Sequence, residues 1–194
     1  MKRLFDVAVS FLGIVFLLPI LLLIIVLMKI TSKGPVIYRQ VRVGKNNTDF
    51  KIYKFRTMKI NADKLGLLSI GDRDSRITKI GYYLRKFKLD ELPQLANVLI
   101  GDMSFVGPRP EVRKYVNLYT QDQMEVFNVR PGITDLASIE FRNESELLSN
   151  QEDSESYYIN VIMPKKLQIN LGYLKDRTLI KDVGVIVKTF LAII

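Results

Sequence analysis

Two adjacent carboxylates, Asp90 and Glu91, are the side chains of this sequence that are best suited to carry out chemistry. The 194 residues include no histidine and no cysteine, which excludes a histidine general base and a thiol nucleophile. A carboxylate is then the obvious nucleophile, as in enzymes that pass through an aspartyl phosphate. Taken alone, such a pair more often marks only a helix N-terminus, where the helix dipole favours negative charge.

Basic residues near the two carboxylates indicate a site for phosphate. Arg85, Lys86 and Lys88 precede the pair, and Arg109 follows it inside a Gly-Pro-Arg-Pro turn at residues 107–110. A helix N-terminus flanked by arginines suits phosphate, and the rigid turn would hold Arg109 as a bidentate clamp. The same turn can equally be a structural feature in which the arginine is incidental. The net charge of +9 points to anionic partners, whether phosphorylated substrates, lipid headgroups or nucleic acid.

The N-terminal segment predicts a helix embedded in a membrane. No residue from 7 to 28 is charged, and a straight helix of this length, at about 1.5 Å per residue, roughly crosses a bilayer core. Pro19 lies in the middle of this run and should kink the helix, because it removes a backbone hydrogen bond. Basic residues flank both ends, which fits a re-entrant helix with both ends on the cytoplasmic side. A helix that spans the bilayer and tolerates the proline is the alternative, and physical reasoning alone does not separate the two.

The rest of the sequence predicts the elements that would position these side chains. Two β-like runs, 36–43 and 50–58, predict a basic hairpin. Helices are predicted over four further segments: 78–88, 90–100, 111–126 and 157–176. The second of these would begin with Asp90 as its N-cap and stop at Gly101. The apolar segment 179–194 predicts either an amphipathic helix lying in the membrane interface or a terminal helix packed on the core.

Several motifs occur together in a characteristic order. The chain has Asp-Glu-Leu-Pro-Gln from residue 90 and Gly-Pro-Arg-Pro from residue 107. Further markers are Lys-Arg-Leu-Phe-Asp at 2–6, the mid-helix proline, Lys-Phe-Arg-Thr-Met at 54–58 and Arg-Pro-Gly-Ile-Thr at 130–134. Residues 72–110 resemble the core of the bacterial sugar transferases, the monotopic phosphoglycosyl transferases that start glycan assembly on undecaprenyl phosphate. The resemblance covers nearly the whole chain, and the number of separate motifs makes it specific.

This resemblance implies a role for each candidate residue. Asp90 would be the nucleophile that attacks the sugar-bearing β-phosphate of a UDP-sugar, so that UMP leaves and the sugar phosphate stays on the carboxylate. Polyprenyl phosphate, which is undecaprenyl phosphate in this family, would then attack that intermediate. Glu91 would assist proton transfer or position a Mg²⁺ ion held near Asp90 and the diphosphate. Positions thought to contact phosphate or line the site are matched by Lys54, Arg85 and Arg109, with Arg130 as a further candidate.

The implied architecture is an α/β fold, mostly helical, with an N-terminal re-entrant membrane helix, a compact cytoplasmic domain, a small β element and interfacial amphipathic helices. Residues 1–30 would form the re-entrant helix and residues 31–194 the cytoplasmic catalytic domain. The expected location is the cytoplasmic face of the bacterial inner membrane, where lipid is a partner and nucleic acid is not. The sequence names neither the sugar nor the glycan pathway, and it leaves the oligomeric state open, a homodimer included.

Two places depart from the family pattern. After the Pro-Gly-Ile-Thr turn many members have a glycine, then an aromatic or apolar residue and a glutamine, whereas this chain reads Asp-Leu-Ala-Ser-Ile-Glu-Phe-Arg over 135–142. This difference bears on sugar or uracil recognition more than on the chemistry. Leu18 stands where some members have a serine, and the kink should survive because the proline is its main cause.

Two other classes of function are weighed against the enzyme. A non-catalytic membrane adaptor that binds anionic lipid or a partner protein explains the membrane helix and the charge, but not a carboxylate pair beside Gly-Pro-Arg-Pro. A membrane-tethered nucleic-acid binder should interleave aromatic and basic residues on one module, whereas tyrosine and phenylalanine are spread through the expected core. The enzyme accounts for the membrane segment, the charge, the missing histidine and the order of the motifs together.

Overall fold

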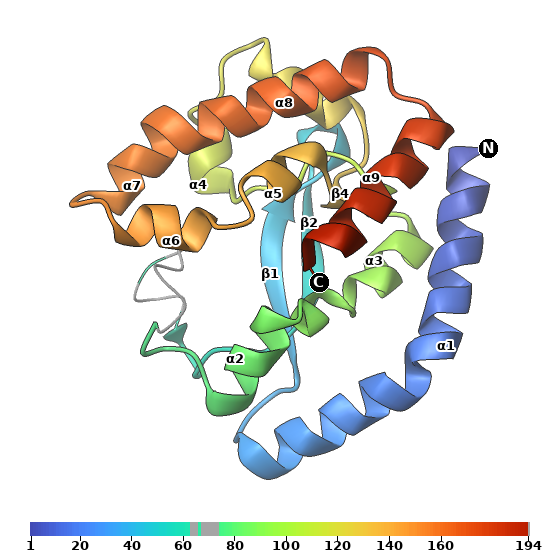
Figure 1. Cartoon of the computed structure of the whole chain (residues 1–194), viewed down its shortest axis with the longest axis vertical. Coiled ribbons are helices and arrows are strands. Elements are labelled where there is room, and N and C mark those ends of the chain that lie inside the picture. The colour runs from blue at the N-terminus through green and yellow to red at the C-terminus, as the bar shows by residue number, and fades with distance from the viewer. Residues whose placement is uncertain (63–65, 67–73, 194) are drawn as a thin grey trace.

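A hairpin of two antiparallel strands lies near the middle of the molecule, with helices around it (Figure 1). The computed structural model describes residues 1–62, 66 and 74–193. Strand β1 (Ile37–Val43) pairs with β2 (Asp49–Phe55). The turn between them holds Asn46 and Asn47 at positive φ, which asparagine tolerates better than most residues. The predicted hairpin is therefore confirmed, although its second strand ends earlier than expected.

Helix α2 (Lys79–Lys86) confirms the helix predicted over 78–88. The hydroxyl of Thr78 accepts from the N–H of Gly81 at 3.0 Å and so caps the first turn. Gly81 has no room for a side chain, because a Cβ there would lie 2.0 Å from the carbonyl oxygen of Thr57. That oxygen also accepts from the backbone N–H of Thr78 at 2.9 Å, so close contact fixes α2 against the end of the hairpin.

The two carboxylates lie in a 3-10 turn, Leu89–Glu91, rather than at the start of a helix. Lys88 takes a left-handed conformation (φ 55°, ψ 19°) and redirects the chain after α2. Helix α3 (Gln94–Ile100) begins after Pro93 and has no side-chain cap. The prediction that Asp90 is the N-cap of this helix is therefore wrong, because the turn and the proline delay the start of the helix.

A second sheet follows α3. Gly101 ends the helix in a left-handed conformation (φ 104°), as predicted, and the chain enters strand β3 (Ser104–Val106). Strand β3 pairs in parallel with β4 (Gly132–Thr134), which puts Ser104 opposite Gly132. Helices form most of the regular structure in the described residues, so the expected mostly helical fold with a small β element is confirmed.

Helix α1 (Lys2–Thr31) is, within the described residues, the one helix long and apolar enough to cross a membrane. Pro19 lies inside it, and the helix is bent rather than straight (Figure 1). Its middle carries exposed apolar side chains, among them Leu12 at 64% and Phe16 at 82% exposure. Such a surface is unfavourable in water and suits lipid. Whether the helix is re-entrant or spanning, and the division of the chain at residue 30, stay predictions.

Both ends of α1 contact the same folded unit. Near its start, Lys2 Nζ donates to the carbonyl oxygen of Val106 in β3 at 2.9 Å. Near its end, Met28 is 1% exposed and packs in a cluster with Phe55 of β2 and Leu84 of α2. The bent helix therefore contacts the folded unit near both ends and along α3, while many apolar side chains of its middle are exposed.

The helix predicted over 111–126 is wrong for most of its length. Only Arg113–Val116 forms a helix, α4, and a 3-10 turn follows at Gln123–Asn128. The rings of Tyr119 and Phe127 stack with their centroids 5.9 Å apart. A continuous helix would separate these two residues by about 12 Å along its axis, so burial of both aromatic rings requires the chain to leave the helix between them.

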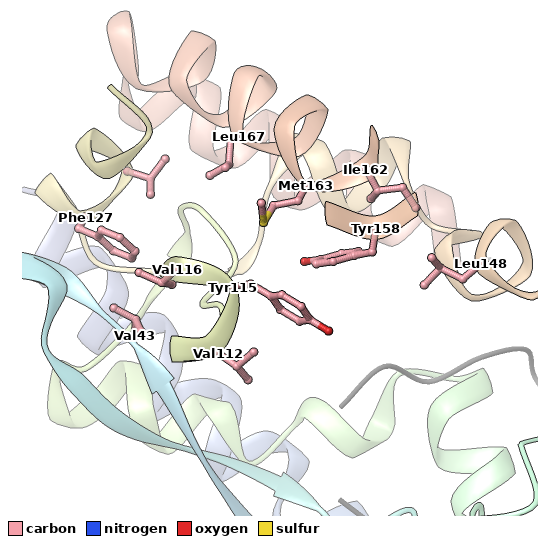
Figure 2. Close-up of a cluster of buried hydrophobic side chains, with 11 residues drawn as sticks. Val43, Val112, Tyr115, Val116, Phe127, Leu148, Tyr158, Ile162, Met163 and Leu167 are labelled. Atoms are coloured by element: carbon pink, nitrogen blue, oxygen red, sulfur yellow. The ribbon is translucent and has the colours of Figure 1, made fainter. Parts of the chain in front are cut away.

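The C-terminal half of the chain surrounds the largest cluster of buried side chains. Its helices are α5 (Leu136–Glu140), α6 (Glu144–Ser149), α7 (Ser154–Tyr157), α8 (Met163–Lys175) and α9 (Leu179–Ile193). A π-helical turn, Tyr158–Ile162, joins α7 to α8, so the segment 157–176 is helical as predicted. Figure 2 shows Tyr115 and Tyr158 side by side in this cluster, and their ring centroids lie 4.9 Å apart.

Helix α9 is amphipathic, as one of the two predictions stated, and many of its apolar side chains are exposed. Ile180 is 84% and Phe190 65% exposed, whereas Asp182 is 3% exposed. The face that packs on the protein is mixed: Asp182 forms an ion pair with Lys2 and accepts from the Tyr173 hydroxyl, and Val185 is buried in a cluster with Tyr173. An outward apolar face suits a lipid interface better than water.

Candidate active site

Three segments that are distant in the sequence bring Lys54, Glu91 and Arg109 into direct contact. Lys54 Nζ, on β2, lies 3.0 Å from Glu91 Oε1. Arg109, in the turn after β3, donates from Nη1 to Glu91 Oε2 at 3.2 Å and from Nη2 to Glu91 Oε1. The arginine is bidentate, as its sequence context predicts, but the group it holds here is a carboxylate of the protein. We refer to Lys54, Glu91 and Arg109 as the charged cluster.

Electrostatic interactions keep Glu91 ionised. Burial alone would raise the pKa of Glu91, but the charges of Arg109 and Lys54 and their hydrogen bonds outweigh it and hold that pKa well below its ordinary range. The charge of Glu91 in turn raises the pKa of the Arg109 guanidinium. Burial lowers the pKa of Lys54, an effect that Glu91 partly offsets and Arg109 strengthens. Glu91 therefore accepts hydrogen bonds and stays unprotonated at neutral pH.

Asp90 has the opposite electrostatic setting. It is half-buried, and burial together with the negative charge of Glu91 raises the pKa of Asp90. The positive charges of Lys54, Arg85 and Lys88 oppose this rise without cancelling it. The two adjacent carboxylates therefore differ: Asp90 is the more basic, and its charge is less compensated than that of Glu91.

The turn that carries Arg109 is fixed by two glycines in very close contact. A Cβ at Gly132 would lie 2.2 Å from the backbone nitrogen of Gly107, and a Cβ at Gly107 would lie 2.5 Å from the carbonyl oxygen of Arg130. The N–H of Gly132 donates to the carbonyl oxygen of Pro108 at 3.0 Å. The Gly-Pro-Arg-Pro and Pro-Gly-Ile-Thr motifs are therefore two sides of one backbone contact, and that contact sets the position of Arg109.

Arg42 also supports this turn and was not among the predicted site residues. Its Nη1 donates to the carbonyl oxygen of Pro110 at 3.2 Å and to Glu111 Oε1 at 3.1 Å. Glu111 also accepts from the Tyr158 hydroxyl, which ties the turn to the large cluster. The only sequence signal was the basic character of the hairpin, and that signal does not distinguish Arg42 from its basic neighbours.

The structure places the two remaining predicted arginines differently. Arg85, on α2, lines the same cavity as Glu91 and Arg109. Arg130 is not among the described residues that line this cavity, and its Nε donates to the carbonyl oxygen of Gly101 at 2.7 Å. The observed contact of Arg130 therefore stabilises the end of α3.

A cavity of about 1250 Å³ opens beside the charged cluster. Arg85, Glu91 and Arg109 line one part of it. Another part is lined by apolar side chains from the middle of α1, including Phe16 and Ile20. The cavity thus joins charged groups suited to phosphate with the helix that carries the exposed apolar surface.

The carboxylates supply an incomplete set of metal ligands. Within the part of the chain described, no group of three or more His, Cys, Asp or Glu side chains could hold a metal ion. Asp90 is not among the described lining residues, although the next residue, Glu91, is. Mg²⁺ is commonly held by one or two carboxylates, with substrate phosphates and water as the other ligands. The donor set around Asp90 therefore fits Mg²⁺ when a phosphate-bearing ligand completes it.

Comparison with known proteins relates the chain to enzymes of glycan assembly. A family model described as bacterial sugar transferase matches residues 1–194. UDP-glucose:undecaprenyl-phosphate glucose-1-phosphate transferase of Klebsiella pneumoniae is 39% identical over 192 residues, which cover 97% of this chain and 39% of the relative. UDP-N-acetylgalactosamine-undecaprenyl-phosphate N-acetylgalactosaminephosphotransferase of Aeromonas hydrophila is 37% identical over 196 residues, 100% of this chain and 43% of the relative. The chain thus spans about two fifths of the length of these two relatives.

A third relative is closer in length. Exopolysaccharide production protein ExoY of Sinorhizobium fredii is 33% identical over 208 residues, which cover 99% of this chain and 84% of the relative. The similarity therefore extends over the whole chain in relatives of both sizes.

Proposed function

This chain belongs to the bacterial sugar transferase family, and we propose that it transfers a sugar 1-phosphate from a UDP-sugar to polyprenyl phosphate. The names of two relatives specify undecaprenyl phosphate as the acceptor and a UDP-sugar as the donor. The observation that carries the proposal is that Asp90 adjoins Glu91 of the charged cluster, and that Glu91 and Arg109 line a cavity that reaches the apolar middle of α1.

In the first step, the Asp90 carboxylate attacks the β-phosphorus of the UDP-sugar. A bond forms between a carboxylate oxygen and this phosphorus, and the bond from the phosphorus to the oxygen that bridges the two phosphates breaks. UMP leaves with that oxygen, and the sugar 1-phosphate stays on Asp90 as an acyl phosphate. The raised pKa of Asp90 supports its role as the nucleophile.

In the second step, a phosphate oxygen of the polyprenyl phosphate attacks the same phosphorus. The bond between phosphorus and the Asp90 oxygen breaks, which gives polyprenyl diphosphate sugar and restores the carboxylate. The apolar side chains that line the cavity from α1 support access by a lipid-borne acceptor, because they suit the polyprenyl chain.

The basic residues compensate the negative charge of the two phosphates. Arg85 and Arg109 line the cavity and would contact the diphosphate, while Lys54 also binds Glu91. Because the pKa of Glu91 is held low, we assign Glu91 to positioning these cations rather than to proton transfer.

Mg²⁺ is proposed as the cofactor, with Asp90 as its protein ligand and the diphosphate and water as the others. When bound, the ion would supply further compensation of phosphate charge. The absence of histidine and cysteine supports an ion that prefers oxygen ligands, as Mg²⁺ does, over one that prefers nitrogen or sulfur ligands.

The proposed location is the cytoplasmic face of the inner membrane. One observation supports a re-entrant rather than a spanning α1. Its two ends contact one folded unit, through Lys2 and Met28, and a helix that crossed the bilayer would place these ends on opposite sides. The outward apolar face of α9, with Ile180 and Phe190, supports contact of the same unit with lipid.

The test is UMP release from a panel of UDP-sugars by the purified chain, with and without undecaprenyl phosphate and with and without EDTA. We expect one or a few donors to support multiple turnovers only when the lipid is present, and EDTA to abolish them. The variant Asp90→Asn should release no UMP. Equal release by wild type and variant would overturn the mechanism, and no release with any donor, together with intact binding to anionic vesicles, would favour the membrane adaptor.

A further inference from the structure

Asn170 is a buried polar residue in the wall of the cavity. It lies on α8 and is 4% exposed, and its side-chain oxygen Oδ1 is buried without a hydrogen-bond partner among the described residues. It also lines the 1250 Å³ cavity. A buried acceptor without a partner is unfavourable in a native structure and requires an explanation.

Packing alone would place an apolar residue at this position. Met163 and Leu167 precede Asn170 by seven and three residues, so all three share one face of α8. Both are 5% exposed, and Figure 2 shows them pointing from α8 into the hydrophobic cluster. An amide in such a row stabilises the fold less than leucine would, unless its polar group forms a hydrogen bond with a ligand.

Several other polar side chains that line the same cavity have partners within the protein. These pairs are Ser138 with Asp135 at 2.9 Å, Thr134 with Thr189 at 2.6 Å and Lys166 with Glu144 at 2.7 Å. Asn170 differs from them because its side-chain oxygen has no hydrogen-bond partner among the described residues. The terminal torsion of asparagine is soft, so the amide can turn toward a ligand in the cavity.

We propose that Asn170 Oδ1 accepts a hydrogen bond from the uncharged part of the donor nucleotide sugar, and so helps to select the donor. The donating group is an O–H or N–H, either of the sugar (a hydroxyl or an acetamido N–H) or of the uracil ring. This inference rests on the transferase function proposed above.

The distribution of charge in the cavity supports this assignment. Arg85 and Arg109 suit the diphosphate, whereas the neutral amide of Asn170 suits a neutral hydrogen-bond donor. The cavity volume of about 1250 Å³ exceeds the roughly 300–1000 Å³ typical of small-molecule sites, which leaves room for both ends of a nucleotide sugar. Asn170 is thus a candidate for recognition of the part of the donor that varies between UDP-sugars.

The test compares Asn170→Leu with the wild type, using the full chain in detergent or nanodiscs. Leucine has a similar size and removes the acceptor, so stability should be unchanged or increased if the amide has no structural partner. Gln168→Leu is the matched control, because Gln168 is an exposed amide on the same helix. The measurements are the melting temperature, the KM for the preferred UDP-sugar, the KM for undecaprenyl phosphate and inhibition by UMP.

We expect Asn170→Leu to raise the donor KM about tenfold, as for the loss of one hydrogen bond, with the acceptor KM and melting temperature preserved. Weaker inhibition by UMP in parallel would identify uracil as the group bound, and unchanged inhibition would identify the sugar. A donor KM within about twofold of wild type would overturn the role of Asn170, as would equal changes in both KM values together with a lower melting temperature. A wild type inactive with every donor would instead overturn the proposed function itself.

Discussion

Arg109 donates from both terminal nitrogens to the carboxylate of Glu91, and not to that of the neighbouring Asp90. Lys54 approaches the same carboxylate from β2 at 3.0 Å. The two adjacent carboxylates are therefore electrostatically unequal: Glu91 is compensated by two cations, and Asp90 is compensated only in part. This inequality supports the proposed roles, in which Asp90 is the nucleophile and Glu91 positions the cations.

Removal of Glu91 and removal of Asp90 should have different effects on the stability of the protein. At neutral pH, Glu91→Gln should destabilise the protein by about 2 kcal/mol, because it leaves two half-buried cations without their anion. Asp90→Asn should leave stability unchanged or increase it, because the raised pKa of Asp90 means that the fold disfavours its ionised form. Thermal unfolding of the two variants measures this difference. An equal loss of stability in both would contradict the inequality of the pair.

The pH dependence of activity should differ from that of stability. The proposed nucleophile is ionised Asp90, whose pKa is raised above its ordinary 3.8, so activity should rise with pH over a range above that value. The pKa of Glu91 is lowered, so its contribution to stability is present above the ordinary value of 4.5 and is lost only as the pH falls through the lowered pKa. Acid should therefore inactivate the protein before it disrupts the charged cluster.

Two measurements on the same samples check this order: the rate against pH, and the melting temperature against pH. A rate that stays constant down to the pH at which the protein unfolds would show that Asp90 has no raised pKa in the working enzyme.

A methyl group at Gly132 should disrupt the turn that carries Arg109. The Cβ of Gly132→Ala would meet the backbone of Gly107 at 2.2 Å, so the two strands would have to separate. We expect loss of activity and a lower melting temperature. Gly184→Ala in α9 is the control, because a Cβ there meets nothing within 4 Å and alanine favours a helix by about 0.5–1 kcal/mol. Similar behaviour of the two variants would contradict the requirement for a close contact between Gly107 and Gly132.

The sequence predicted those parts of the fold that depend on local chemistry. The hairpin follows from two β-like runs, the end of α3 from Gly101, and α2 from the helical pattern over 78–88. The helix expected over 111–126 failed because burial of Tyr119 against Phe127 outweighs local helical preference. Such a contact between rings is not visible in the helical pattern of that segment.

The sequence predicted which types of residue form the site, but not which of these residues contact one another. The turn after α2 separates Asp90 from α3, because Lys88 adopts a left-handed conformation that the sequence does not signal. Arg42 resembles other basic residues of the hairpin, and only the fold brings it to Glu111. Asn170 lies in a helix of mixed composition, and its burial becomes apparent only when α8 covers the cavity.

Pro19 should determine how α1 sits in the membrane. The chain has no cysteine, so Leu4→Cys and Lys33→Cys each introduce a unique exposed label site, one at either end of the helix. We expect a membrane-impermeant maleimide to reach both from the cytoplasmic side. Added to each, Pro19→Ala should restore the missing backbone hydrogen bond, straighten the helix and move the Leu4→Cys site out of reach. Unchanged labelling at both sites would show that Pro19 does not set the topology.

The most direct test of the proposed chemistry is the mass of the intact protein after incubation with its UDP-sugar in the absence of any acceptor lipid. We expect an added mass of one sugar phosphate, located on Asp90, together with one UMP released per protein molecule. Asp90→Asn should show neither the added mass nor the release. UMP that appears only when polyprenyl phosphate is added, with no modified protein at any time, would mean that the lipid attacks the donor directly and that Asp90 is not the nucleophile.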